Sequence, residues 1–267
     1  MDLKLQGKVA LVTGGSKGIG KGIASSLAAE GANVVISARG KAELEETAAE
    51  LNGAGRGQVA AIVADLIKAA DAVRLVEETV RRFGKLHVLV NNAGAIDNFG
   101  SYDELGDDNW QALFDINVLS VVRVTRAALP HLRREKWGRI INIASENALQ
   151  PDPFMPHYSA TKAALLNMTK SMSKAFAADG ILVNAVSPAF ILTSMSSEVI
   201  RQRAAAGGLS FEEAERRLLK ELRPNMLLNR TGRLEEVGSA VAYLASEAAS
   251  FITGTNLRVD AGSVASL

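Results

Sequence analysis

The chain contains no cysteine among its 267 residues. This absence excludes disulfides, thiolate metal sites and a cysteine nucleophile, and it fits the cytoplasm, which is the compartment we expect. Histidine is also scarce, because only His87, His131 and His157 are present, and they lie far apart in the sequence. No metal-ligand spacing joins them, so no metal site is predicted.

Long hydrophobic runs and a net charge of one sign are absent as well. The longest uncharged span, residues 180–197, contains an asparagine, a proline and several serines and is too polar to cross a bilayer. Asp2, Lys4 and Lys8 interrupt the first apolar stretch, which is therefore not expected to be a signal peptide. The 30 basic and 29 acidic side chains are intermixed, so neither nucleic acid nor a membrane is an expected partner.

The apolar content of the chain is high enough for a large hydrophobic core. Apolar residues make up 48% of the chain, and no linker rich in proline, serine or glycine divides it, so we expect one domain over residues 1–267. Short apolar runs alternate with helical patterns, which predicts the α/β class: a doubly wound, Rossmann-type parallel sheet of seven strands with helices on both faces. The expected strands are 9–12, 33–37, 59–63, 86–90, 139–144, 182–186 and 256–259. The expected helices lie near 41–52, 69–83, 108–134, 158–176 and 234–246.

A glycine-rich loop and a helical pattern follow the first strand. Its glycines are spaced as Gly-x-x-x-Gly-x-Gly, which differs from the usual Gly-x-Gly-x-x-Gly fingerprint and from a P-loop. Glycines let backbone amides approach an anion, and a helix N-terminus adds partial positive charge. The sequence therefore predicts a phosphate-binding turn. Its residues are Gly14, Ser16, Lys17, Gly18, Ile19 and Gly20.

The end of the second strand lacks the acidic residue that holds the ribose hydroxyls in NAD-binding folds. Residues 37–39 are Ser-Ala-Arg, and the next acid is Glu43, in the following helix. Arg39 offers a guanidinium fork to a 2′-phosphate, and Lys17 adds a second positive charge. NADP(H) is therefore the predicted cofactor and NAD(H) the alternative. The other interpretation of Arg39 is a solvated loop side chain.

A hydroxyl, a phenol and an amine occur at spacings that suit proton transfer. Ser145 follows an apolar strand, and Tyr158 and Lys162 share one face of a helix, about one turn apart. A phenol has a pKa near ~10, and a nearby ammonium favours its ionised form. A Tyr-x-x-x-Lys pair is also common by chance on solvated helices, so its meaning depends on the other motifs.

Taken together, these motifs make the chain similar to the short-chain dehydrogenase/reductase family over residues 7–262. The matching pieces are residues 13–20, Asp65, Asn91-Asn92-Ala93-Gly94, Asn117, Ser145, Tyr158, Lys162, Pro188 and Thr193. The resemblance implies that Tyr158 is the general acid/base and that Ser145 positions the substrate carbonyl. It implies that Lys162 holds the nicotinamide ribose and lowers the Tyr158 pKa, and that Asn117 holds a proton-relay water. The implied cofactor-binding residues outside the glycine loop are Arg39, Asp65, Leu66, Asn91, Ala93, Gly94, Tyr158, Lys162, Pro188 and Thr193.

Two glycines of the family pattern are alanines in this chain. Its Pro-Gly after the sixth strand is Pro188-Ala189, and its terminal Asp-Gly-Gly is Asp260-Ala261-Gly262. Because alanine lacks the conformational freedom of glycine, we expect these changes to alter the backbone near the nicotinamide rather than the overall activity.

Residues 191–224 do not fit the alternation of strands and helices. Ser210 and Glu213 form a capping box that opens an amphipathic helix, which Pro224 ends. We expect this segment to be a substrate lid, and the other interpretation is a packing element without that role. The predicted substrate-binding residues are Ser145, Glu146, Asn147, Phe154 and Tyr158.

The predicted activity is the interconversion of a ketone and a secondary alcohol with NADP(H). The resemblance leans toward reductases of 3-oxoacyl thioesters, although no motif identifies the substrate. One alternative is an NAD-dependent alcohol or polyol dehydrogenase. Another is a catalytically silent nucleotide-binding regulator, which the intact Ser145, Tyr158 and Lys162 argue against. A wide apolar arc on the 158–176 helix, with the family resemblance, predicts a homotetramer or homodimer.

Overall fold

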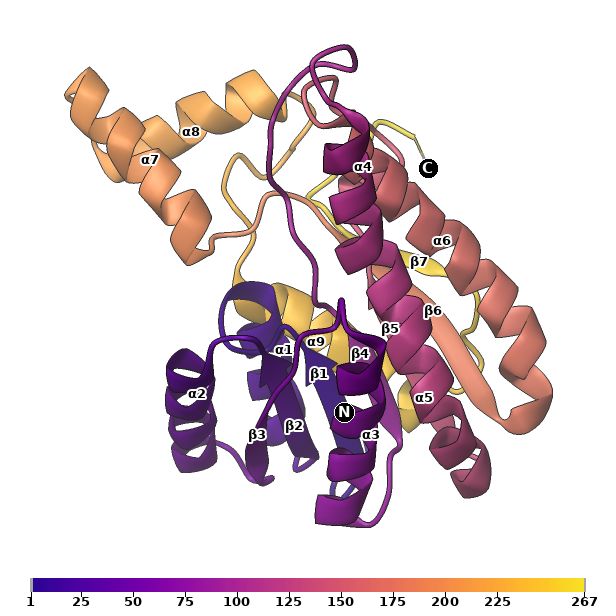
Figure 1. Ribbon diagram of the computed structural model, residues 1–267. Coiled ribbons are helices and arrows are strands. Elements are labelled where there is room, and N and C mark those ends of the chain that lie inside the picture. Colours follow the sequence, from indigo (N-terminus) through magenta and orange to yellow (C-terminus); the bar gives the residue numbers. More distant parts are fainter. Residues whose placement is uncertain (1, 267) are drawn as a thin grey trace.

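The structure, a computed structural model, describes residues 2–266 and contains one parallel sheet (Figure 1). The strands run in the order β3-β2-β1-β4-β5-β6-β7, which confirms the predicted α/β class, the doubly wound topology and the seven strands. The chain reverses its direction of winding between β1 and β4, where ligands of such folds bind. The strands are β1 (Val9–Thr13), β2 (Asn33–Ala38), β3 (Val59–Val63), β4 (Val88–Asn91), β5 (Gly138–Ile143), β6 (Ile181–Pro188) and β7 (Asn256–Val259).

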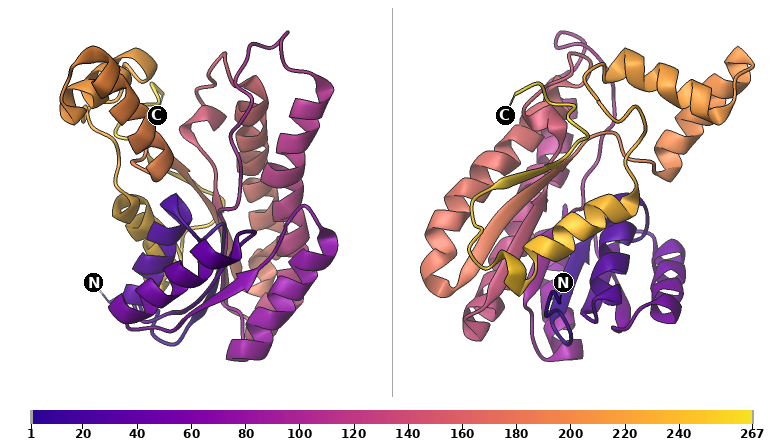
Figure 2. Two further views of the ribbon diagram at one scale, coloured as in Figure 1. Left: turned by 60° about the vertical axis from the view of Figure 1, so that its left-hand side comes forward. Right: turned by 180° about the vertical axis from the view of Figure 1, so that it is seen from behind.

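Helices cover both faces of the sheet (Figures 1 and 2). One face packs against α1 (Gly18–Ala29), α2 (Lys41–Ala54) and α9 (Leu234–Leu244). The other packs against α3 (Ala69–Phe83), α5 (Ser120–Glu135) and α6 (Pro156–Phe176). Because helices cover both faces, the central strands are mostly apolar rather than alternating, and every residue of β1 is buried. Among residues 2–266, no helix combines the length and the apolarity that a membrane span requires.

The predicted long helix over residues 108–134 is present, but its middle is a π-helical turn that the sequence did not predict. The helix α4 (Asp107–Phe114) leads into a π-helical turn, Asp115–Leu119, and α5 follows. Such turns insert one residue into a helix and often occur at functional sites. Asn117 lies in this turn. Periodicity along the sequence cannot show the insertion, because the apolar pattern continues on both sides of it.

The segment predicted to be a lid, residues 191–224 and called the lid below, contains two helices where the sequence predicts one. The predicted helix is α8 (Phe211–Leu222), and α7 (Ser194–Gly207) precedes it. Thr193 and Ser196 cap the start of α7, and only Ile200 on it is fully buried, so its sequence carries little apolar periodicity. Figures 1 and 2 show both helices standing above the carboxyl ends of the strands, apart from the two helical layers.

The apolar arc of α6 packs partly within the chain. Leu165 is buried against Val121 and Ala144, and Met172 and Phe176 pack against the core beneath α5. Ala175 is exposed and the residues of the arc other than Leu165 are half-buried, so the arc is only in part an intramolecular contact. The homotetramer or homodimer expected from the sequence stays a prediction.

Candidate active site

The glycine-rich loop lies between β1 and α1, at the carboxyl edge of the sheet. Gly14 has a φ of 66°, and a Cβ on Gly20 would lie 2.1 Å from the Gly14 carbonyl oxygen, so both positions require glycine. Two side chains outside the predicted site hold the loop. Asn92 Nδ2 donates to the carbonyls of Thr13 and Gly14 at 2.9 and 3.0 Å, and the Thr13 hydroxyl accepts the Asn92 and Ala93 amides at 3.0 Å each. The turn is thus fixed against the end of β4.

An acidic side chain lies where the sequence predicts recognition of a 2′-phosphate. Ser16 Oγ donates to Glu43 Oε2 at 3.0 Å, and Lys17 Nζ lies 3.3 Å from Glu43 Oε1. The exposed Arg39 follows β2 a few residues earlier. The sequence places Glu43 only in the next helix, whereas the fold brings it to the glycine loop. A 2′-phosphate would therefore compete with this carboxylate for Lys17.

Not every predicted cofactor residue is placed to offer a side chain to a ligand. Asn91 Nδ2 donates to Thr125 Oγ1 at 3.2 Å and to Asn142 Oδ1 at 2.9 Å, all three side chains being buried. Leu66 is part of the hydrophobic core. Asp65 follows β3 and is partly exposed. Asn91 therefore serves to fix the end of β4, which agrees with a supporting role rather than a direct contact through its side chain.

Ser145, Tyr158 and Lys162 meet at the end of β5. The Ser145 hydroxyl lies close enough to the Tyr158 phenol to lower its pKa. Lys162 Nζ donates to the Ile143 carbonyl at 2.9 Å and lies 5.5 Å from the centroid of the Tyr158 ring. A Cβ on Gly94 would lie 3.7 Å from the same Nζ, so the loop after β4 borders the ammonium.

Asn117 joins this group through the π-helical turn. Its Oδ1 accepts the Ala95 amide at 2.8 Å, and its Nδ2 donates to the Ala95 carbonyl at 3.0 Å and to Thr161 Oγ1 at 3.1 Å. The side chain therefore binds the loop after β4 to α6, the helix of Tyr158 and Lys162. The water that Asn117 is predicted to hold stays a prediction.

The lid borders the same site from the side of β6. Pro188 is the last residue of that strand, and Thr193 caps α7. A Cβ on Gly18 would lie 3.5 Å from Thr193 Cγ2. The start of the lid thus approaches the glycine-rich loop, and both predicted residues lie at the carboxyl edge of the sheet.

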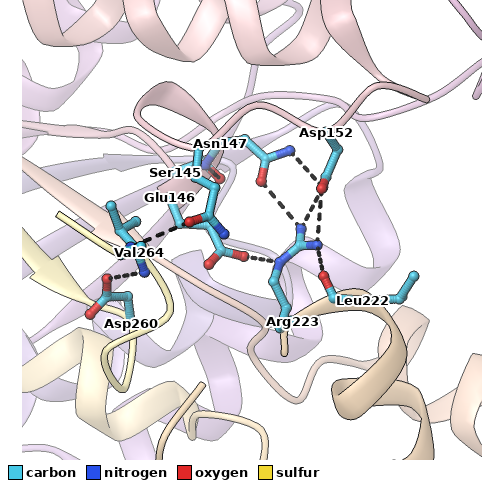
Figure 3. A network of polar contacts seen from close by, with 10 residues as sticks. Ser145, Glu146, Asn147, Asp152, Leu222, Arg223, Asp260 and Val264 are labelled. Carbon is cyan, nitrogen blue, oxygen red and sulfur yellow. Dashed lines mark hydrogen bonds and ion pairs between the residues drawn. The ribbon is translucent and has the colours of Figure 1, made fainter. Parts of the chain in front are cut away.

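The predicted substrate residues Glu146 and Asn147 are buried and bonded to Arg223, which the sequence did not single out (Figure 3). Their side chains are occupied by a protein partner, and the substrate contacts predicted for them stay a prediction. Phe154 is half-buried and lies 6.3 Å from Phe99, centroid to centroid. The only signal for Arg223 in the sequence is its position directly before the proline that ends α8.

The pKa of the Tyr158 phenol is raised rather than lowered. Burial is the main cause, and the nearby Glu146 carboxylate adds to it, whereas Ser145 and Arg223 act in the opposite direction. Burial also lowers the pKa of Lys162 to about 8. The expectation that Lys162 lowers the Tyr158 pKa is therefore wrong in its net direction, because the enclosing protein favours the neutral form of both groups.

Within the described part of the chain, no three His, Asp or Glu side chains gather as a metal ion would need. The groups present are proton donors, proton acceptors and an anion-binding turn. They lie at the carboxyl edge of one sheet, between the glycine loop and the lid.

Comparison with known proteins places this architecture in a family. The sequence model of the short chain dehydrogenase family matches residues 8–204. The chain is 39% identical to the uncharacterized oxidoreductase YvaG of Bacillus subtilis over 100% of both chains. It is 36% identical to the D-beta-hydroxybutyrate dehydrogenase of Cupriavidus necator over 98% of this chain and 99% of that one. A crystal structure of L-sorbose reductase from Gluconobacter frateurii, complexed with NADPH and L-sorbose, is 32% identical, covers 100% of both chains and has a TM-score of 0.93. Since the match spans most of the chain and the relatives align over nearly their whole length, the protein belongs to the short chain dehydrogenases, which are oxidoreductases acting on CH–OH groups.

Proposed function

We propose that this protein is an NADP(H)-dependent oxidoreductase that interconverts a ketone and a secondary alcohol, with Tyr158 as the general acid/base. The observation that carries the proposal is the meeting of three groups: the Ser145 hydroxyl beside the Tyr158 phenol and the Lys162 ammonium over the phenol ring. A proton donor beside a hydroxyl that can orient a carbonyl oxygen is what carbonyl reduction needs.

In the reductive direction, the Tyr158 phenol gives its proton to the substrate oxygen while the carbonyl carbon gains a hydride. A nicotinamide dinucleotide, when bound, supplies that hydride or accepts it in the reverse reaction. In the oxidative direction, the Tyr158 phenolate removes the hydroxyl proton of the alcohol. Burial raises the phenol pKa and so favours the neutral form, which is the form that can donate a proton.

The residues around the glycine loop fit a dinucleotide. Gly14 and Gly20 lack a Cβ where one would collide with the backbone. Positive charge comes from the exposed Arg39 and from Lys17, which is paired with Glu43. This charge favours the 2′-phosphate of NADP(H), and the NADPH in the related L-sorbose reductase supports the same choice. The further residues that we propose near the cofactor are Asp65, Ala93, Gly94, Lys162, Pro188 and Thr193.

Two substrate classes follow from the relatives. The related proteins include the 3-oxoacyl-[acyl-carrier-protein] reductase FabG of Haemophilus influenzae, 36% identical over 97% of this chain and 98% of that one. The L-sorbose reductase instead reduces a small polar ketone and aligns along the whole chain, including the lid. We therefore propose 3-oxoacyl thioesters and small polar ketones as the two classes to compare.

The test is a steady-state assay of cofactor absorbance with both substrate classes and both reduced cofactors. Tyr158→Phe should lower kcat by about 100-fold or more, the range for losing a general acid, while NADPH binding followed by fluorescence stays unchanged. Tyr102→Phe, whose side chain is exposed, is the matched control and should behave as the wild type. Unchanged turnover in Tyr158→Phe would discard the mechanism, and a preference for NADH would discard the cofactor assignment. Inert thioesters beside active polar ketones would exclude the fatty-acid class.

A further inference from the structure

Arg223 joins the lid to the loop that carries the proposed catalytic groups. It caps the end of α8, which stops there because the residue before a proline disfavours helix. Its side chain is 8% exposed and points away from the lid toward the end of β5 (Figure 3). A guanidinium is rarely buried in this way unless its donors are bonded to acceptors.

The guanidinium holds the loop between Ser145 and Tyr158 at two places. Nε donates to Glu146 Oε1 at the start of the loop. Nη1 and Nη2 donate to the two carboxylate oxygens of Asp152 at 3.2 and 2.6 Å, farther along it. Nη2 also donates to Asn147 Oδ1 at 3.2 Å, and Asn147 Nδ2 donates to Asp152 Oδ2 at 3.1 Å. A planar fork fixes the directions of these bonds as well as their lengths.

The position of the Ser145 hydroxyl depends on this loop. Ser145 Oγ accepts the Asn147 amide at 3.2 Å, and the Ser145 carbonyl accepts the Ala148 amide at 3.1 Å. Glu146 and Asn147 directly follow Ser145, so the bonds from Arg223 act on the turn that places this hydroxyl near the Tyr158 phenol. A displacement of about 1 Å at a reacting group can cost roughly 100-fold in rate.

Arg223 also sets the balance of charge around Tyr158. The charged groups that face the phenol are Glu146 and Arg223 across the loop and Lys162 on its own helix. Burial is the main cause of the raised Tyr158 pKa, Glu146 adds to it and Arg223 opposes it. Without the guanidinium, the carboxylates of Glu146 and Asp152 would lose their shared partner beside the phenol.

We propose that Arg223 is a positioning residue for the reaction, which fixes the Ser145 loop against Tyr158 and anchors the end of the lid to it. This inference rests on the proposed function, because it assigns Arg223 a role in proton transfer to the substrate. Arg223 acts through Glu146, Asn147 and Asp152 and is not placed to react itself.

The experiment compares Arg223→Met, Arg223→Lys, Glu146→Gln and the double variant Arg223→Met/Glu146→Gln with the wild type, each as the full chain with its reduced cofactor. Arg223→Met should lower kcat by roughly 10- to 100-fold and leave the Kd of the cofactor unchanged. Its alkaline limb in the pH profile of reduction should move up, because the guanidinium that lowers the phenol pKa is gone. Glu146→Gln should move that limb down, and the double variant should return it toward the wild-type position.

Arg223→Lys keeps the charge without the fork, so it should restore the pH profile while kcat recovers only in part. This variant and Glu146→Gln keep the inference testable if Arg223→Met fails to fold. Arg217→Met, on the exposed surface of α8, is the matched control and should match the wild type. The inference would be overturned if Arg223→Met has the wild-type kcat. It would also be overturned if kcat falls but the alkaline limbs of Arg223→Met and Glu146→Gln do not shift in opposite directions. If Tyr158→Phe is also fully active, the proposed function fails with it; if Tyr158→Phe is inactive, only the role of Arg223 is wrong.

Discussion

Ala261 provides a test of the backbone beside the site, at a position where the family pattern has glycine. Its φ of 51° lies in the left-handed region, which costs an alanine about 1–2 kcal/mol and a glycine little. Replacing the alanine by glycine removes this cost from the folded state. It also makes the unfolded chain more flexible, which offsets about 0.5–1 kcal/mol of the stabilisation. Ala261→Gly should therefore raise the free energy of unfolding by about 0.5–1 kcal/mol, or roughly 1–4 °C in Tm.

The matched control is Ala189, the other alanine at a family glycine. Its φ lies outside the left-handed region, so Ala189→Gly gains nothing in the native state and should lower the free energy of unfolding by about 0.4–1 kcal/mol. Urea unfolding followed by circular dichroism, at one protein concentration for all variants, measures both. If Ala261→Gly destabilises the protein as Ala189→Gly does, the argument from the left-handed backbone is refuted.

The remaining predictions concern charge. Arg39→Ala should weaken NADP(H) binding by about 1–3 kcal/mol and leave NAD(H) nearly unchanged, as measured by fluorescence titration. Glu43→Gln frees Lys17 from a carboxylate 3.3 Å away and should tighten NADP(H) binding by up to about 1 kcal/mol, roughly fivefold; equal changes for both dinucleotides would contradict these two predictions. Lys162→Met removes an amine whose pKa is lowered by burial from 10.5 to about 8. Burying this charged amine destabilises the folded wild type. The destabilisation is complete below pH 8 and disappears as the pH rises to 10.5. The variant should be more stable than the wild type at pH 7 by at most about 3 kcal/mol in urea unfolding, and a difference that does not shrink toward pH 10.5 would disprove this.

The sequence by itself determined the class of the fold, the number of its strands and the approximate place of each along the chain. It did so because these features rest on local signals. Apolar runs as long as a strand alternate with amphipathic stretches, and the spacing of Gly14, Gly18 and Gly20 appears within one loop. The carboxyl ends of parallel strands share one edge, so Ser145 and Tyr158 were expected to lie together before any contact was known.

The tertiary structure alone decided which polar groups pair and how they titrate. Arg223 and Glu146 are 77 residues apart in the sequence, and Ser16 and Glu43 are 27 apart, so no local pattern links either pair. The π-helical turn at Asn117 leaves the apolar periodicity intact and is therefore hidden in the sequence. The Tyr158 pKa is raised, whereas the sequence predicts that it is lowered. The spacing of residues gives the distance from Tyr158 to Lys162 along a helix, but it does not give the burial of the phenol. Burial has the larger effect on this pKa.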